Sequence, residues 1–195
     1  ACRGAQKAGK PILMFKIGGS AASRAAALAH TGALAGSTEV FDAVAGQSGV
    51  VRLDSLDHIV EAAEYFLHAP APKGRRATAI TLSGGFKGLL LECADRNGVI
   101  FPELAPETLT ALKTVLGDDV TLGNPIDGGF TVVSSRESYY KCIDILAADK
   151  NTDVLILQEE LPRFDTADRK AENLRGMEKR VAGGGPKPFA VLSKI

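Results

Sequence analysis

The feature that most constrains the fold is a regular alternation of short apolar runs and helical segments in residues 77–195. Strands that alternate with helices require crossover connections, which are right-handed and leave the strands parallel. Five strands are predicted, at 77–82, 99–104, 120–122, 153–158 and 189–195. Four helices are predicted, at about 84–97, 106–116, 136–148 and 166–181. The sequence therefore predicts an α/β fold with a doubly wound parallel sheet.

Residues 1–68 form a separate segment with fewer elements. The apolar run 11–17 predicts a strand buried on both faces, and 50–53 predicts a second strand. Helices are predicted to begin after the capping residues Ser37 and Ser55. Because two short parallel strands leave edges that proteins normally cover, we expect this segment to be the C-terminal half of a second α/β domain. The chain is accordingly expected to be a fragment.

Composition and charge limit the partners and the compartment. Lys+Arg 23 equals Asp+Glu 23, which argues against nucleic acid or an anionic membrane as a partner. No apolar run approaches the length of a bilayer span, so we expect a soluble protein. The cysteines form no close pair, which favours a reducing cytoplasm and no thiolate metal site; they are Cys2, Cys93 and Cys142. The Pro-rich, basic residues 69–76 predict a linker.

The chain has three histidines, and one of them lies in an unusual setting. His58 and His68 fall at the two ends of the helix predicted after Ser55, where solvated or capping roles are expected. His30 lies within the small residues 29–36, which let backbone approach a ligand closely. It is either a functional histidine or a loop histidine with a local hydrogen bond.

A glycine-rich turn joins the first predicted strand of residues 77–195 to its helix. Ser83, Gly84 and Gly85 predict an anion site, because free amides and the helix dipole favour negative charge there. The spacing is not that of a P-loop. Glu103, at the end of the next predicted strand, resembles the ribose-binding acid of dinucleotide sites. A nicotinamide or flavin site and a turn without a ligand are therefore alternatives.

Residues 123–129, after the third predicted strand, supply two further candidates. The carboxyl ends of parallel strands form the ligand crevice of an open sheet. Asn124 and Asp127 are therefore expected on the same rim as Ser83–Gly85. The alternative is an Asn-Pro turn in which Asp127 bonds backbone amides.

The order of these motifs resembles the NDP-forming acyl-CoA synthetases, relatives of succinyl-CoA synthetase. The motifs are Lys10-Pro-Ile-Leu, Gly18–Ser20, Ala29-His-Thr-Gly-Ala-Leu-Ala-Gly36, Gly49-Val-Val-Arg-Leu53, Ser83-Gly-Gly85 and Gly123-Asn-Pro-Ile-Asp127. The resemblance implies that His30 is transiently phosphorylated and carries a phosphoryl group between an acyl phosphate and a nucleotide. It implies phosphate contacts from Thr31, Gly32 and Ser83–Gly85, with Asn124 and Asp127 on the substrate rim.

The resemblance also implies a domain plan. Residues 1–68 correspond to the C-terminal part of the phosphohistidine domain, and 77–195 to a flavodoxin-like, three-layer α/β/α domain. CoA, ATP or GTP, and Mg²⁺ belong to the whole enzyme, with CoA-binding and ATP-grasp domains in the same or a partner chain and a small carboxylic acid or acyl phosphate as substrate. The resemblance leaves open whether the enzyme is a homo-oligomer. The fragment alone is expected to be inactive. Phe86 and Lys87 depart from the family's loop, so the acid is not assigned.

The sequence is therefore compatible with three functions. The leading one is acid + CoA + NTP giving acyl-CoA + NDP + phosphate through phospho-His30. The second is a non-catalytic flavodoxin-like regulatory domain that binds an anion or nucleotide. The third is a dinucleotide-binding oxidoreductase domain that uses Gly84–Gly88 and Glu103.

Overall fold

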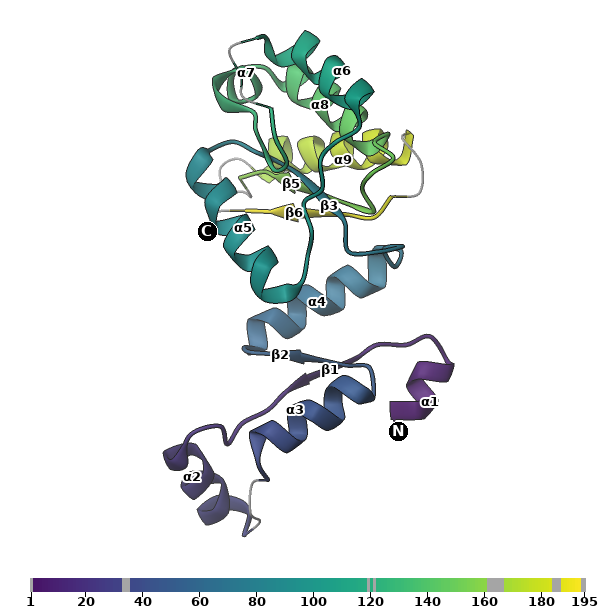
Figure 1. The fold of residues 1–195 in the computed structure, drawn as a ribbon. Coiled ribbons are helices and arrows are strands. Elements are labelled where there is room, and N and C mark those ends of the chain that lie inside the picture. The colour runs from purple at the N-terminus through teal and green to yellow at the C-terminus, as the bar shows by residue number, and fades with distance from the viewer. Residues whose placement is uncertain are drawn as a thin grey trace. The chain divides into compact units, whose positions relative to one another are not determined.

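The computed structural model describes residues 2–32, 36–118, 120, 122–160, 167–183 and 187–193. The chain falls into two compact units, Ala1–His68 and Ala69–Ile195 (Figure 1). The division lies where the sequence places the start of the linker. Residues 69–76 group with the second unit.

The first unit contains a two-stranded parallel sheet with helices around it. Strands β1 (Ile12–Phe15) and β2 (Val50–Leu53) pair in register from Ile12–Val50 to Phe15–Leu53. The helices are α1 (Cys2–Lys7), α2 (Ala21–Thr31), α3 (Thr38–Gln47) and α4 (Leu56–His68). The predicted caps are confirmed, since the Ser37 hydroxyl accepts from the Val40 amide and the Ser55 hydroxyl from the His58 amide.

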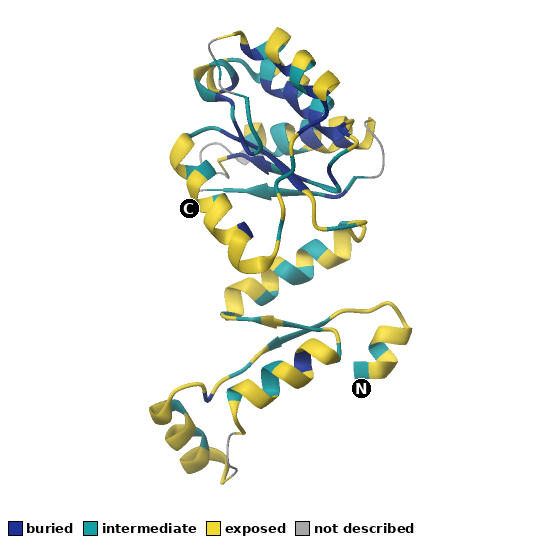
Figure 2. Ribbon diagram, viewed as in Figure 1, coloured by how far each residue is buried: buried dark blue, intermediate teal, exposed yellow. Residues whose placement is uncertain are grey.

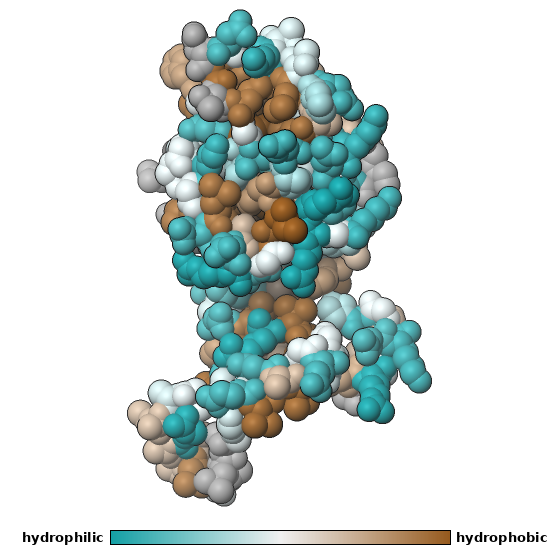
Figure 3. All heavy atoms as spheres, viewed as in Figure 1, coloured by the Kyte–Doolittle hydropathy of each residue, from teal (hydrophilic) through white to brown (hydrophobic). Residues whose placement is uncertain are grey.

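Two expectations for the first unit are wrong. The first strand is shorter than 11–17 and is not buried on both faces: its residues are half-buried or exposed, and Ile17 is 71% exposed. Among the described residues of this unit, Ala45 alone is a buried hydrophobic residue, so apolar side chains lie at the surface (Figures 2 and 3). Two strands are too few to bury their own faces.

The second unit is built on a four-stranded parallel sheet of order β4-β3-β5-β6. Its strands are β3 (Ala77–Thr81), β4 (Ile126–Asp127), β5 (Val154–Gln158) and β6 (Phe189–Leu192). Its helices are α5 (Gly84–Asn97), α6 (Pro106–Leu116), α7 (Gly129–Ser134), α8 (Arg136–Ala147) and α9 (Ala167–Gly183). Helices α5 and α8 lie on opposite sides of the sheet (Figure 1). The doubly wound α/β fold is confirmed.

The core of this unit lies between the sheet and α6, α8 and α9. The apolar residues Ile80, Ile126 and Leu157 sit side by side on neighbouring strands and pack into it. Helices α8 and α6 contribute the largest fully buried apolar side chains on their side: Tyr139, Ile143, Leu146 and Leu112. Buried residues accordingly concentrate in β3, β5 and α8 (Figure 2). These packed side chains anchor the carboxyl-terminal parts of β3 and β5, where Ile80 and Leu157 lie.

Two of the five predicted strands are wrong, and one side chain explains why. Residues 99–104 contribute only an isolated bridge between Arg76 and Ile100. At 120–122 the described residues carry no strand, and β4 forms further along instead. The Asn124 side chain occupies the free edge of β3: its Oδ1 accepts from the Ala79 amide at 3.3 Å, and its Nδ2 donates to the carbonyls of Ala77 at 2.8 Å and Pro102 at 2.9 Å. A side-chain amide thus replaces backbone pairing there.

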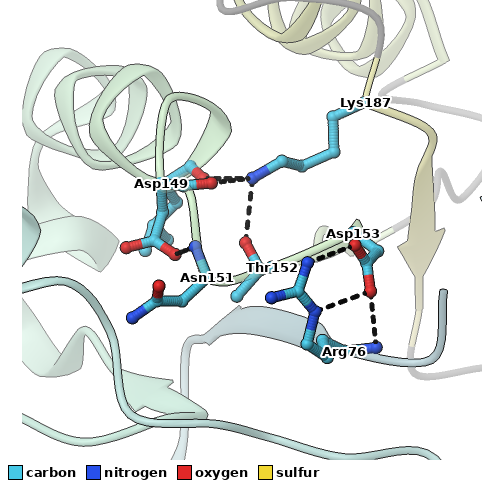
Figure 4. Close-up of polar contacts among 7 residues, drawn as sticks. Arg76, Asp149, Asn151, Thr152, Asp153 and Lys187 are labelled. Atoms are coloured by element: carbon cyan, nitrogen blue, oxygen red, sulfur yellow. Dashed lines mark hydrogen bonds and ion pairs between the residues drawn. The ribbon is translucent and has the colours of Figure 1, made fainter. Parts of the chain in front are cut away.

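The amino edge of the sheet is held by polar contacts (Figure 4). The Arg76 guanidinium forms a two-pronged pair with Asp153, at 3.0 Å from Nε and 2.7 Å from Nη2. The Lys187 ammonium donates to the carbonyls of Leu146 and Asp149 and, at 2.8 Å, to the hydroxyl of Thr152. Burial lowers the pKa of Lys187. These contacts lie at the end of the sheet opposite Ser83, which follows the carboxyl end of β3.

Candidate functional site

The strand β3 leads directly into α5 at the carboxyl edge of the sheet. Ser83 is the N-cap of α5, and its hydroxyl oxygen accepts from the Phe86 amide at 3.3 Å. Gly84 and Gly85 occupy the first two helical positions, where amides have no acceptor within the helix. The positive end of the helix dipole lies at the same place. The prediction that Ser83–Gly85 join a strand to a helix N-terminus is confirmed; binding of an anion there stays a prediction.

Asp127 lies beside this helix N-terminus. It pairs with Thr81 in the register between β4 and β3, which brings it level with the end of β3. Its Oδ1 accepts from the Gly129 amide at 3.1 Å, as the turn alternative expected. Its Oδ2 lies 3.1 Å from the position that a Cβ atom of Gly84 would occupy. Among the described residues, no atom outside the helix's own backbone lies within 4 Å of the corresponding position at Gly85, so the turn is open on the Gly85 side.

The expectation that Asn124 lies on the carboxyl rim is wrong: its side chain bonds Ala77 and Ala79, at the start and middle of β3. Both hydrogens of its amide group go to the carbonyls of Ala77 and Pro102. Asn124 therefore supports the strand edge on which Asp127 and Ser83 depend, and its amide donors do not face a ligand.

Two residues at the end of β5 were missed from the sequence. Gln158 is 1% exposed, and its Oε1 accepts from the Leu82 amide at 2.9 Å. Glu159 is 2% exposed and pairs with Arg136 at 2.5 Å and Lys170 at 2.6 Å. Burial alone would raise the pKa of Glu159, but hydrogen bonds from Arg136 and Lys170 bring that pKa below its usual value. The sequence signal that could have revealed them is the change from the apolar run 154–157 to the polar residues Gln158 and Glu159 at the carboxyl end of a strand.

His30 lies in a helix, which corrects the expectation of a loop. It occupies the last turn of α2, is exposed, and forms no hydrogen bond or ion pair within the described residues. Gly32 ends the helix with φ 67° and donates its amide to the Leu28 carbonyl at 2.9 Å. The Thr31 hydroxyl donates to the Ala27 carbonyl at 2.8 Å. The Gly32 amide and the Thr31 hydroxyl therefore hold the helix end, and His30 lies at its negative pole.

The other two histidines lie on α4. His58 is exposed in the first turn, and His68 ends the helix with its Nε2 at 3.3 Å from Glu64. These are the surface roles that the sequence analysis favoured for both residues.

Glu103 is not placed as a ribose-binding acid would be. It belongs to no strand, and its carbonyl accepts from the side chain of Asn151, which precedes β5. Glu103 therefore lies near the amino edge of the sheet, whereas Ser83 follows the carboxyl end of β3. The two features do not combine into a dinucleotide site.

The described residues offer neither a metal-binding cluster nor a membrane-spanning helix. They contain no group of three or more His, Cys, Asp or Glu side chains that could hold a metal ion. None of the helices that the structure describes is both long and apolar enough to cross a bilayer.

Known proteins are similar to this chain in sequence and in fold. The family described as succinyl-CoA ligase like flavodoxin domain matches residues 1–66. The alpha subunit of an ADP-forming acetate–CoA ligase II from Pyrococcus furiosus is 33% identical over 180 residues, which cover 91% of this chain and 38% of the relative. An ADP-forming acetate–CoA ligase II from Archaeoglobus fulgidus is 30% identical over 166 residues, 84% of this chain and 25% of the relative.

A solved structure agrees with the fold. The acetyl-coenzyme A synthetase 1 of Ca. Korarchaeum cryptofilum, in complex with phosphate and ADP, superposes with a TM-score of 0.78 at 22% identity. That alignment covers 93% of this chain and 38% of the other.

The parallel sheets with helix N-termini at their carboxyl ends define a flavodoxin-like α/β protein. The chain belongs to the NDP-forming acyl-CoA synthetases and corresponds to part of such an enzyme. The resemblance drawn from the motifs is thereby confirmed. The family's flavodoxin domain falls on the first unit, whereas the sequence analysis used that name for residues 77–195.

Proposed function

We propose that this chain is the phosphohistidine-bearing segment of an acid–CoA ligase that converts acid, CoA and NTP into acyl-CoA, NDP and phosphate. The similarity to ADP-forming acetate–CoA ligases over 91% of the chain supports the reaction class. The exposed position of His30 at the end of α2 is the observation that carries its assignment as the phosphoryl carrier. The acid and the nucleotide base are left open.

The chemistry proposed for His30 has three steps. A neutral imidazole nitrogen attacks the terminal phosphorus of the NTP, and NDP leaves. The carboxylate of the acid then takes the phosphoryl group from His30, which gives an acyl phosphate. The thiol sulfur of CoA attacks the acyl carbon, releasing phosphate and a proton. The nitrogen that does not react needs an acceptor to fix the tautomer.

The position of His30 suits a transient carrier. A phosphoryl group on its imidazole would place negative charge at the carbonyl end of α2, where the helix dipole disfavours it. This repulsion raises the free energy of the phosphorylated state and thereby favours onward transfer.

The N-terminus of α5 is proposed as the anion site of the second unit. The amides of Gly84 and Gly85 would donate to phosphoryl oxygens, with Ser83 capping the helix. Asp127 limits the space beside Gly84, so the anion approaches from the Gly85 side. Thr31 and Gly32 are proposed to shape the His30 site through the helix end that they hold.

The other parts of the reaction need domains of the longer enzyme. CoA-binding and ATP-grasp domains, in the same or a partner chain, are proposed to bind CoA, ATP or GTP, and Mg²⁺. The free state of Cys2, Cys93 and Cys142 supports a cytoplasmic location. The chain spans 38% of the Pyrococcus furiosus relative, so the segment alone is expected to be inactive.

A regulatory domain that binds an anion without chemistry is the second candidate. The α5 N-terminus favours it, because that site forms within the second unit and does not require a reactive histidine.

Labelling of the full-length enzyme distinguishes the two candidates. The enzyme is incubated with ATP that carries ³²P in its γ-phosphate, and protein-bound label is tested for stability in acid and in base. We expect label that is lost in acid and retained in base, and its disappearance in His30→Asn. His58→Asn is the matched control, since His58 is also an exposed helical histidine of the first unit. Equal labelling of His30→Asn and the wild type would remove His30 as the carrier.

A further inference from the structure

Gln158 carries a buried donor without a partner. The residue is 1% exposed, and its Nε2 forms no hydrogen bond within the described residues. Buried polar groups of native proteins are nearly always paired, because an unpaired one retains its full desolvation cost. The side-chain NH₂ of Gln158 therefore calls for an acceptor that the described residues do not provide.

The orientation of the Gln158 amide is fixed by its neighbour. The Leu82 amide donates to Oε1 at 2.9 Å, and only an oxygen can accept that hydrogen bond. Exchanging Oε1 and Nε2 would place two donors face to face. The assignment of Nε2 as the unpaired atom thus follows from the hydrogen-bond network.

The strand register places Gln158, the last residue of β5, near the N-terminus of α5. Its predecessor Leu157 pairs with Ile80, so Gln158 is level with Thr81, the residue that pairs with Asp127 on its other side. Directly paired residues of parallel strands point to the same face of a sheet. Gln158 and Asp127 therefore flank Thr81 on one face, and the bond to Leu82 holds the Gln158 amide one residue before the Ser83 cap.

We propose that Gln158 is a further anion-binding residue, whose Nε2 donates to a phosphoryl oxygen of the ligand held by the Gly84 and Gly85 amides. The inference rests on the proposed anion site at α5 and adds a side-chain donor to it. The ligand class is a phosphate monoanion or dianion or the phosphoryl group of an acyl phosphate.

Titration of the ¹⁵N-labelled full chain with inorganic phosphate tests this directly. Sodium chloride at matched ionic strength is the reference for non-specific shifts. We expect the backbone amides of Gly84 and Gly85 and the side-chain NH₂ of Gln158 to shift together, with one common Kd. Shifts at the glycines with an unmoved Gln158 NH₂ would overturn the role of Gln158 and leave the α5 site standing. No shift at any of the three would overturn both.

A pair of variants supplies a second test. Gln158→Met keeps the length of the side chain without a donor, and we expect about tenfold weaker phosphate binding, the effect of one hydrogen bond to a charged group. Thr78→Val is the matched control, because Thr78 Oγ1 is another buried atom without a partner, on the opposite face of β3. It should leave the Kd unchanged. An unchanged Kd in folded Gln158→Met would refute the proposal, and if that variant does not fold, the wild-type titration decides.

Discussion

The Oδ2 atom of Asp127 lies 3.1 Å from the position that a Cβ atom of Gly84 would occupy. The two residues are far apart in sequence and meet because β4 pairs with β3 at Asp127 and Thr81. The contact explains why a glycine begins α5 although glycine disfavours helices. It also places a carboxylate beside a helix N-terminus, where the dipole stabilises negative charge.

Alanine substitution should separate the two glycines of this turn. Gly84→Ala forces Asp127 to move, whereas Gly85→Ala adds a methyl group in open space and improves helix propensity. We expect the free energy of unfolding of Gly85→Ala to equal that of the wild type or to exceed it by up to about 1 kcal/mol. Gly84→Ala should be less stable than Gly85→Ala by about 1 kcal/mol. Urea denaturation of the full chain measures both. Equal stabilities would show that Asp127 does not restrict residue 84.

Substitutions at Ser83 should distinguish capping from anion binding. Ser83→Ala removes the acceptor for the Phe86 amide and should cost about 1 kcal/mol of stability. Ser83→Asp keeps a cap but adds a carboxylate to that of Asp127, so stability should be retained while phosphate binding weakens. Unchanged phosphate affinity in folded Ser83→Asp would exclude this turn as the anion site.

Asn124→Asp should destabilise the second unit. Aspartate keeps an acceptor for the Ala79 amide but loses both donors, which leaves the carbonyls of Ala77 and Pro102 unpaired. We expect a loss of about 2–4 kcal/mol by urea denaturation, since each unpaired buried group costs about 1–3 kcal/mol. Asn97→Asp is the matched control, because it removes one exposed hydrogen bond to Cys93. Equal effects of the two variants would contradict the role given to Asn124.

Protonation of Glu159 should lower the free energy of unfolding in acid. Its pKa in the folded protein is below the ordinary value of 4.5, despite burial, because Arg136 and Lys170 donate hydrogen bonds to it. The stabilisation is complete above pH 4.5 and is lost as the pH falls through the lowered pKa. Glu159→Gln should flatten this part of the profile of unfolding free energy against pH. Glu92→Gln, which removes an exposed pair with Arg96, should leave the profile unchanged. A Glu159→Gln profile as steep as that of the wild type would contradict the assignment.

The local elements followed from the sequence because their causes are local. The caps at Ser37, Ser55 and Ser83 begin the helices that the sequence predicted, and Pro106 opens α6. Capping and proline geometry depend on residues within one helical turn, so the sequence contains the whole interaction. The glycine turn at the carboxyl end of β3 was predictable for the same reason.

The pairing of strands and the surroundings of each site residue depended on the tertiary structure. The sequence predicted strands at 99–104 and 120–122, but the Asn124 side chain took the edge of β3 and Ile126–Asp127 became β4. Strand pairing is decided by the partner that reaches an edge, and no local pattern contains that information. The sequence likewise could not show that the Gln158 amide donor is unpaired, because its burial and its bond to Leu82 exist only once β5 lies beside β3.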